Sequence, residues 1–298
     1  MIIVKLRGGL GNQLFQYAAG RCLAILNNTQ LKLDLGGYIQ DRPDVQRGVR
    51  IYGLANFKIN ASLADAADLQ FLTSQSARLR GERFLDKIKP YYLRRHVTEP
   101  HKNYFIFDRR LLRTSARPKI YLEGYWQSEK YFLANTDLIL KEFQVKEAAS
   151  GLNAQYLTQF KNEPAVAVHV RHGDNATALA MNHGVLPLDY YSRAGEIIKT
   201  KVAAPRFYVF SDDINWAKAN LRLPDALTFV DHNDDLHNYE DLRLMSACSH
   251  HIVGNSTFSW WGAWLAQHPE QIVVAPKRYY VNQDVANTDL YPPAWQLI

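Results

Sequence analysis

Three short segments of the chain carry residue types that bind phosphate groups and sugar hydroxyls. The first, Ala165–Asp174 (AVAVHVRHGD), begins as an apolar run and ends in charged residues and a glycine. Within it, Arg171 could bind a phosphate through two parallel N–H donors, and it keeps its charge at every physiological pH. The same ending also fits a strand terminus at which Arg171 and Asp174 only pair with each other, so both interpretations stay open here.

The other two segments have the same mixture of polar groups. Ser211-Asp212-Asp213 offers carboxylates to ribose hydroxyls or a base edge, or else caps the helix that follows. The segment Asn255–Phe258 fits a helix N-cap, and its N–H groups together with the helix dipole would equally bind a phosphate. Three tryptophans follow it, and we expect them in the core: Trp260, Trp261 and Trp264.

All three segments follow predicted strands in the second half of the chain. Strands are predicted at the apolar start of Ala165–Asp174 and at Arg206–Phe210, Thr228–Val230, His250–Gly254 and Gln271–Pro276. Helices are predicted between them at Leu188–Lys199, Ile214–Asn220, Asn238–Ser249 and from Asn255 to about Gln267. This alternation predicts a doubly wound parallel sheet, in which ligands bind beyond the carboxyl ends of the strands. Agreement between three strand ends favours a ligand site there.

The first half begins with a strand at Ile2–Leu6, a glycine turn at Arg7–Asn12 and a helix to about Leu26. Glycines in such a turn let the backbone approach a ligand, although the spacing is not GxGxxG. A second strand at Leu31–Leu35 places Asp34 where dinucleotide folds carry a ribose-binding acid. A nicotinamide-dependent oxidoreductase therefore stays open as an alternative, as does a tight turn without a ligand.

Beyond residue 36 the pattern is less regular until the middle of the chain. Helices are predicted at Ala61–Thr73 and Tyr131–Phe143, with a strand and turn at Lys119–Trp126 and a loop-rich basic section before it. The segment Lys146–Gly151 is small, polar and weakly patterned. We therefore expect two domains, 1–150 and 151–298, which also suits a chain of 298 residues.

The composition is that of an ordinary globular protein, with 47% hydrophobic and 21% charged residues. The two cysteines, Cys22 and Cys248, give no disulfide framework, which fits a reducing compartment. The N-terminus does not read as a signal peptide, and no stretch approaches the roughly 18 apolar residues of a membrane span. We expect a soluble, cytoplasmic protein.

The net charge of +6 is concentrated in residues 78–119, which hold thirteen Lys or Arg against four Asp or Glu. Such a stretch could contact an anionic membrane, making the protein peripheral at the inner membrane, or bind acidic glycans, or simply face solvent. No nucleic-acid-binding signature accompanies it. A non-catalytic glycan- or lipid-binding protein is therefore the second alternative.

A metal site is not expected. The Asp-x-Asp pattern of metal-dependent sugar-nucleotide transferases is absent, as are a P-loop, a GxSxG elbow and HExxH. His169 and His172 would face opposite sides of a strand, which argues against one metal between them. The acidic run Asp231–Asp235 lacks the glycine of a calcium loop.

Four segments together resemble a known family: Arg7–Gln16 (RGGLGNQLFQ), Leu122–Phe132 (LEGYWQSEKYF), His169–Asp174 (HVRHGD) and Met245–Leu265 (MSACSHHIVGNSTFSWWGAWL), with support from Phe210–Trp216 (FSDDINW). The sequence is similar over almost its whole length to the bacterial α-1,2-fucosyltransferases of glycosyltransferase family 11. The resemblance implies an α/β fold of the GT-B type, with two Rossmann-like domains facing a cleft. It implies an N-terminal acceptor-side domain and a donor site in the C-terminal domain.

The resemblance also implies a reaction and its partners. L-fucose would move from GDP-fucose, with inversion and without a metal or cofactor, to the 2-hydroxyl of a terminal β-galactoside. The acceptor would be a galactose-terminated glycan, as in oligosaccharide or O-antigen assembly, and no nucleic acid would be involved. The oligomeric state is left open.

Individual residues receive roles from the same resemblance. It places Arg171 on the donor diphosphate and His169 and Asp212 near the guanosine. The residues expected in catalysis are Arg171, His169, Asp174 and Asn12. The residues expected in donor binding are Gly9, Gly11, Asn12, His169, Arg171, Ser211, Asp212, Asn255, Ser256, Thr257 and Phe258.

Two departures from the family pattern stand near Arg171. His172 occupies a position where family members often carry a second arginine, and Asn175 one where they carry an aromatic residue. Because His172 can be neutral near pH 7, it is not assigned a phosphate charge. No single general base stands out, although Asp174 and His169 can accept a proton.

Overall fold

The computed structural model describes residues 1–36, 38, 51–73, 77–99, 105–115, 119–173, 184–281 and 285–298. The chain divides into two compact units. The first unit contains Met1–Gln144 and Ala286–Leu290, and the second contains Val145–Val285 and Tyr291–Ile298. The division expected from the sequence, at 150/151, does not include the return of Ala286–Leu290 to the first unit.

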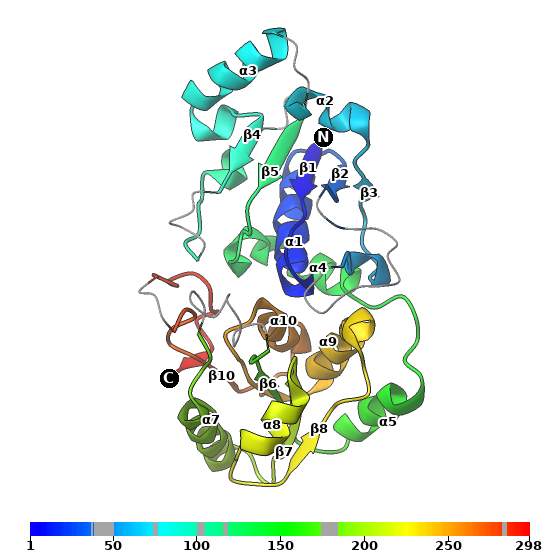
Figure 1. Ribbon diagram of the computed structural model, residues 1–298, viewed down its shortest axis with the longest axis vertical. Coiled ribbons are helices and arrows are strands. Elements are labelled where there is room, and N and C mark those ends of the chain that lie inside the picture. The colour runs from blue at the N-terminus through cyan, green and yellow to red at the C-terminus, as the bar shows by residue number, and fades with distance from the viewer. Residues whose placement is uncertain are drawn as a thin grey trace. The chain divides into compact units, whose positions relative to one another are not determined.

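The first unit is built on a five-stranded parallel sheet with the strand order β3-β2-β1-β5-β4 (Figure 1). Its strands are β1 (Ile2–Lys5), β2 (Leu31–Asp34), β3 (Ser62–Leu63), β4 (His96–Thr98) and β5 (Ile120–Glu123). Its helices are α1 (Leu10–Leu26), α2 (Ala66–Thr73), α3 (Ala77–Ile88) and α4 (Thr136–Glu142).

Helices cover both faces of this sheet because the apolar residues of β1 alternate between them. On one face α1 packs closely, since an added Cβ at Gly20 would collide with the side chain of Val4. On the other face Ile3 and Tyr121 form a small core with Phe71 of α2.

The second unit is built on a six-stranded parallel sheet with the order β11-β10-β9-β6-β7-β8. Its strands are β6 (Ala165–Val170), β7 (Arg206–Ser211), β8 (Leu227–Phe229), β9 (His250–Ile252), β10 (Val273–Ala275) and β11 (Gln296–Leu297). Its helices are α5 (Gly151–Phe160), α7 (Leu188–Lys201), α8 (Ile214–Asn220), α9 (Asn238–Ala247) and α10 (Thr257–Ala266).

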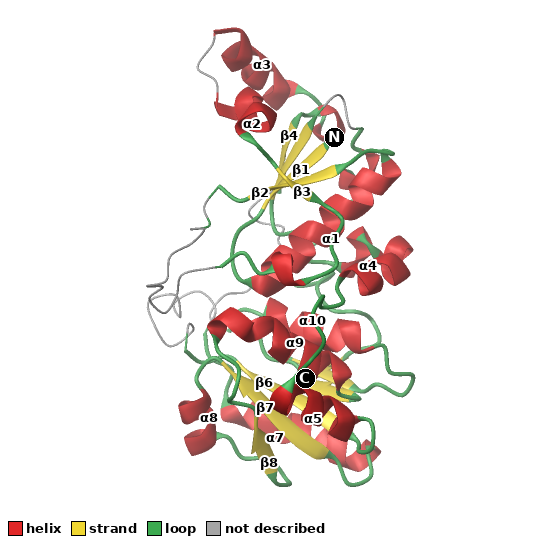
Figure 2. Cartoon of the chain, turned by 90° about the vertical axis from the view of Figure 1, so that its right-hand side faces the viewer, coloured by secondary structure: helices red, strands yellow, loops and turns green. Residues whose placement is uncertain are grey.

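Strand β6 is fully buried because its two faces enter two different cores. Val166, Val168 and Val170 pack with residues of α7 and α8. Ala165 and Ala167 pack on the opposite face with residues of α5 and α9. The sheet therefore lies between two layers of helices (Figure 2), and the predicted doubly wound parallel architecture is confirmed.

Several elements differ from the sequence prediction in the first half of the chain. The basic section contains α3 and β4, and the helix predicted at Ala61–Thr73 is the strand β3 followed by the shorter α2. Helix α3 leaves three of its large apolar side chains exposed, so the apolar residues of its sequence do not mark a buried face. The helix predicted at Tyr131–Phe143 is α4 preceded by single 3₁₀ turns.

The tryptophans of α10 lie in the core, as expected from the sequence. Trp260, Trp261 and Trp264 are each at most 5% exposed and contact one another. None of the helices in the described ranges is long and apolar enough to cross a membrane.

Candidate functional site at the strand ends of the second sheet

The second sheet has a topological switch point between β6 and β9. From β6 the chain moves outward through β7 and β8 on one side, and then through β9, β10 and β11 on the other. Loops that leave neighbouring strands in opposite directions open a crevice at their carboxyl ends. Arg171, Asp212 and Asn255 follow β6, β7 and β9, three adjacent strands, so the structure brings the three polar segments to one edge.

Arg171 is paired with Asp212 from the neighbouring strand end. Its Nε lies 3.3 Å from Asp212 Oδ2, and both side chains are about four-fifths buried. Asp212 Oδ1 accepts the backbone N–H of His172 at 2.8 Å, and the backbone of Arg171 hydrogen-bonds Tyr191 in α7. Arg171 thus pairs with Asp212. The pair that the sequence suggested between Arg171 and Asp174 stays a prediction, because Asp174 lies outside the described residues.

His169 is a buried, neutral imidazole at the same edge. It is 3% exposed, and its Nδ1 has no hydrogen-bond partner among the residues that the structure describes. Burial, reinforced by the charge of Arg171 and opposed by that of Asp212, lowers the pKa of His169 to about 4. Such a group can share a hydrogen bond with a ligand, but it is too weak a base to hold a substrate proton near pH 7.

The start of α10 lies directly against His169. An added Cβ at Gly254 would come within 2.7 Å of the His169 carbonyl oxygen and 3.2 Å of Nδ1. This close approach requires glycine, and it places the α10 start beside the end of β6. Sequence reasoning had not singled out Gly254, although it stands just before the Asn255–Phe258 segment.

The residues of that segment form a capped helix start. Ser256 is the N-cap of α10, and its Oγ accepts the N–H of Phe258 at 3.2 Å. Asn255 is 3% exposed and donates through Nδ2 to the Gly184 carbonyl at 3.0 Å. Its Oδ1 is buried without a hydrogen-bond partner in the described part of the chain. Two buried polar atoms, Asn255 Oδ1 and His169 Nδ1, are therefore able to bind a ligand at this edge, and burying either unpaired costs about 1–3 kcal/mol.

His172 is held on the other face of the sheet, as the alternation predicted. Its ring stacks on Trp216 of α8 with centroids 3.9 Å apart, and its Nδ1 lies 2.9 Å from Asp213 Oδ2. Asp213 also caps α8 by accepting the Trp216 N–H, and Ser211 Oγ accepts the Asp213 N–H at 3.0 Å. Ser211 and Asp213 thus serve the turn and the cap, and within the Ser211–Asp213 segment Asp212 is the residue that reaches Arg171.

The remaining predicted residues belong to the first unit. Gly9 precedes α1 as its N-cap, Gly11 lies in the first turn, and Asn12 Oδ1 accepts Gln127 Nε2 at 2.9 Å. The first sheet has its own switch point between β1 and β5, and this turn follows β1. A role for Gly9, Gly11 and Asn12 in the donor site stays a prediction.

Asp34 does not offer its carboxylate to a ligand. It is 7% exposed, its Oδ2 accepts the Tyr121 hydroxyl at 2.5 Å, and its Oδ1 accepts the Gly36 N–H at 2.8 Å. Both carboxylate oxygens of Asp34 therefore have partners within the first unit. This structural role explains the acid after the second strand, which had favoured a nicotinamide-dependent oxidoreductase.

Glu99 is a buried acid that sequence reasoning missed. It follows β4, is 4% exposed, and accepts the backbone N–H groups of Tyr125 and Trp126. Burial raises the pKa of Glu99 to about 7, although these donors oppose the shift. It holds the turn after β5, where Trp126 has a φ of 55°. Nothing in the weakly patterned sequence around β4 marks this residue.

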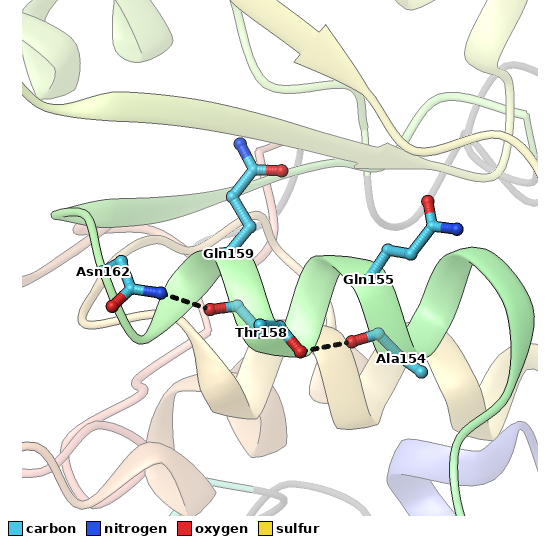
Figure 3. A pocket seen from close by; sticks show the side chains of 5 residues that line it. All are labelled: Ala154, Gln155, Thr158, Gln159 and Asn162. Atoms are coloured by element: carbon cyan, nitrogen blue, oxygen red, sulfur yellow. Dashed lines mark hydrogen bonds between the residues drawn. The ribbon is translucent and has the colours of Figure 1, made fainter.

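A surface pocket lies elsewhere, on α5. It is lined by Ala154, Gln155, Thr158, Gln159 and Asn162 (Figure 3). Thr158 Oγ1 donates to the Ala154 carbonyl, and Asn162 Nδ2 donates to the Thr158 carbonyl (Figure 3). These polar groups serve their own helix, and the residues precede β6 rather than follow a strand. The pocket is not a candidate for the site.

Within the described ranges, no group of three or more His, Cys, Asp or Glu side chains could hold a metal ion. Independence from metals stays a prediction.

Comparisons with known proteins agree with the motifs. The profile described as "Glycosyl transferase family 11" matches residues 1–298. An "Alpha-1,2-colitosyltransferase" from Escherichia coli is 28% identical, covering 99% of this chain and 98% of its own. The "O-antigen biosynthesis glycosyltransferase WbnK" of the same species is 28% identical over 94% of this chain and 95% of its own.

A human protein and a solved structure match more distantly. The human "Galactoside alpha-(1,2)-fucosyltransferase 1" is 30% identical over 50% of this chain and 44% of its own. The crystal structure of the fucosyltransferase NodZ from Bradyrhizobium has 14% identity and a TM-score of 0.48, covering 91% of this chain and 94% of its own.

Proposed function

The chain belongs to glycosyltransferase family 11, and we propose that it is an inverting α-1,2-fucosyltransferase. It moves L-fucose from GDP-fucose to the 2-hydroxyl of a terminal β-galactoside on a glycan, as in O-antigen or oligosaccharide assembly. The observation that carries the proposal is the pairing of Arg171 with Asp212 at the switch point, beside the start of α10. The names of a colitosyltransferase and a galactoside fucosyltransferase among the relatives support the 2-linkage.

The donor site that we propose neutralises a diphosphate without a metal ion. Arg171 binds the phosphate oxygens, and Asp212 fixes the direction of its guanidinium. The α10 start at Ser256, Thr257 and Phe258 adds the positive end of a helix dipole, while the N–H groups of Ser256 and Phe258 already donate to the Gly254 carbonyl and to Ser256 Oγ. His169, neutral near pH 7, hydrogen-bonds the guanosine at the end of β6.

The reaction that we propose is a single displacement. The acceptor 2-hydroxyl forms a bond to the anomeric carbon of fucose, the bond from that carbon to the phosphate oxygen breaks, and the hydroxyl proton leaves. Arg171 stabilises the negative charge that grows on the departing phosphate, an effect that is typically about 3 kcal/mol. His169 is too weakly basic to take the proton, and Asn12 carries no basic group, so Asp174 is the remaining candidate base.

The first question that the experiment answers is whether the nucleotide donor carries fucose or colitose. Colitose is fucose without its 3-hydroxyl, so a site that hydrogen-bonds this group rejects colitose strongly. The protein is therefore incubated in EDTA with GDP-fucose or with the nucleotide donor of colitose, and with a panel of β-galactosides. The linkage of each product is determined by NMR.

We expect fucosylated product with an α-1,2 linkage, in equal yield with and without EDTA. A product only from the colitose donor, or a linkage to another hydroxyl, would overturn the assignment of donor or linkage. Loss of product in EDTA would overturn metal independence. The absence of transfer to any galactoside, with GDP binding intact, would overturn the acceptor.

A further inference from the structure

Helix α3 presents an unusual apolar face to solvent. Phe84, Leu85 and Ile88 are 68%, 53% and 71% exposed, and Leu93 just beyond the helix is 47% exposed. Single exposed apolar side chains are normal, but Phe84, Leu85 and Ile88 lie within about one turn of one helix and form a patch of the kind that marks an interaction site. Helix α3 lies beyond one end of the sheet of the first unit (Figures 1 and 2).

The opposite face of α3 fixes the helix on the protein. Asp86 is 6% exposed, and its carboxylate accepts the backbone N–H groups of Arg95 and His96 at 2.8–2.9 Å. Residues two positions apart on a helix point about 200° from each other, so Phe84 and Ile88 point away from Asp86. The apolar face is thus held outward by the packing of the buried face.

The C-terminal end of α3 is fixed as well. Arg94 donates to the carbonyls of Lys89 at 3.0 Å and Lys87 at 2.9 Å, which satisfies groups that a helix end leaves unpaired. Lys89 pairs with Asp86 at 3.2 Å. These contacts hold the helix end, and no contact of this kind needs Phe84, Leu85 or Ile88.

The net positive charge of the segment that carries the patch favours one kind of partner. Residues 77–95 contain seven Lys or Arg against two Asp or Glu, and Lys87 is exposed beside the apolar side chains. A second copy of the chain would bring two such basic segments together, which costs energy. An anionic bilayer complements the charge and also accepts the apolar side chains at its headgroup boundary.

We propose that α3 docks the protein on an anionic lipid bilayer, with Phe84, Leu85 and Ile88 entering the headgroup region. Helix α3 belongs to the first unit, whereas the strand ends of the proposed donor site belong to the second. The docking proposal therefore does not depend on the proposed donor or linkage. Transfer to a soluble acceptor is expected to be equally efficient with and without docking on the bilayer.

The test measures co-sedimentation of the full chain with vesicles of phosphatidylcholine alone or mixed with phosphatidylglycerol. The variant Phe84→Ser/Leu85→Ser/Ile88→Ser keeps the charge and removes the apolar groups. The matched control is Leu152→Ser on α5, which is 50% exposed in the second unit. Circular dichroism and the melting temperature show that each variant is folded, and turnover of a soluble β-galactoside shows that the donor site is intact.

We expect the wild type and Leu152→Ser to bind the mixed vesicles, more weakly as salt rises, and the triple variant to bind at least about tenfold more weakly. Equal binding of the triple variant and the wild type, or no binding of the wild type to anionic vesicles, would overturn the proposal. A dimer in sedimentation velocity without lipid, lost in the triple variant, would instead make this face an interface between copies and would also overturn it.

Discussion

At the scale of single residues, the direction of the Arg171 side chain depends on Asp212, the residue that pairs with it. An arginine alone at a strand end is mobile, whereas Nε fixed 3.3 Å from Asp212 gives the guanidinium one direction. The sequence predicted that Arg171 was important because of its type and its place after an apolar run. It could not identify the partner, because Asp212 is 41 positions away and only the pairing of β6 with β7 brings the two together.

The pH dependence of the free energy of unfolding tests whether His169 is buried as a neutral group. Its pKa of about 4 in the folded protein lies below the ordinary 6.5, so between these values the unfolded chain binds more protons. The contribution of His169 to stability is therefore complete above pH 6.5 and falls as the pH falls towards 4. We expect the wild type to lose about 2 kcal/mol more than His169→Gln when the pH is lowered from 7 to 5.

This comparison is made by urea unfolding at both pH values. The pKa of His251 is also lowered to about 4, but His251 is present in both proteins and its effect cancels. Parallel pH dependences of the wild type and the variant would show that His169 is not buried as a neutral group.

At the scale of elements, the site depends on how closely the start of α10 approaches β6. Gly254→Ala places a Cβ 2.7 Å from the His169 carbonyl oxygen, a backbone atom of the buried strand β6 and not the end of a flexible side chain. We expect a loss of stability of about 1–3 kcal/mol and weaker GDP binding, because the helix start must shift.

Gly81→Ala is the matched control for this change. Gly81 lies within α3 with nothing within 4 Å of an added Cβ, so alanine there should stabilise the helix by about 0.5–1 kcal/mol and leave GDP binding unchanged. Calorimetry gives both quantities. If Gly254→Ala melts and binds GDP like the wild type, the close approach does not matter.

The elements differ in how far their sequences predict them. Strand β6 was predicted because both of its faces are buried, which leaves a continuous apolar run, and helix α7 because one buried face leaves a helical period. Helix α3 was missed because its apolar residues face solvent and its buried face is the carboxylate Asp86, whose partners are backbone N–H groups. The apolar residues of α3 are spaced as on a helix, but they stand among many charged residues, and the segment was therefore predicted as a basic loop.

At the scale of the whole molecule, the two parallel sheets follow from the alternation of strands and helices. The return of Ala286–Leu290 to the first unit does not, because it depends on tertiary contacts: Asp289 accepts the Phe107 N–H at 2.7 Å and pairs with Lys130. Both sheets place glycine- or charge-rich loops at their switch points. The motifs recognised in the sequence lie in these loops, where ligands of such folds bind.

The central claim is that Arg171 binds the donor diphosphate without help from a metal, and titration calorimetry of GDP in EDTA tests it most directly. The control is Arg193→Ala, which removes an exposed arginine of α7 that pairs only with Asp189 among the described residues. We predict equal GDP affinity for the wild type and Arg193→Ala, and about 10²-fold weaker binding, or about 3 kcal/mol, for Arg171→Ala. Wild-type affinity in a folded Arg171→Ala protein, or loss of GDP binding by the wild type in EDTA, would contradict the account.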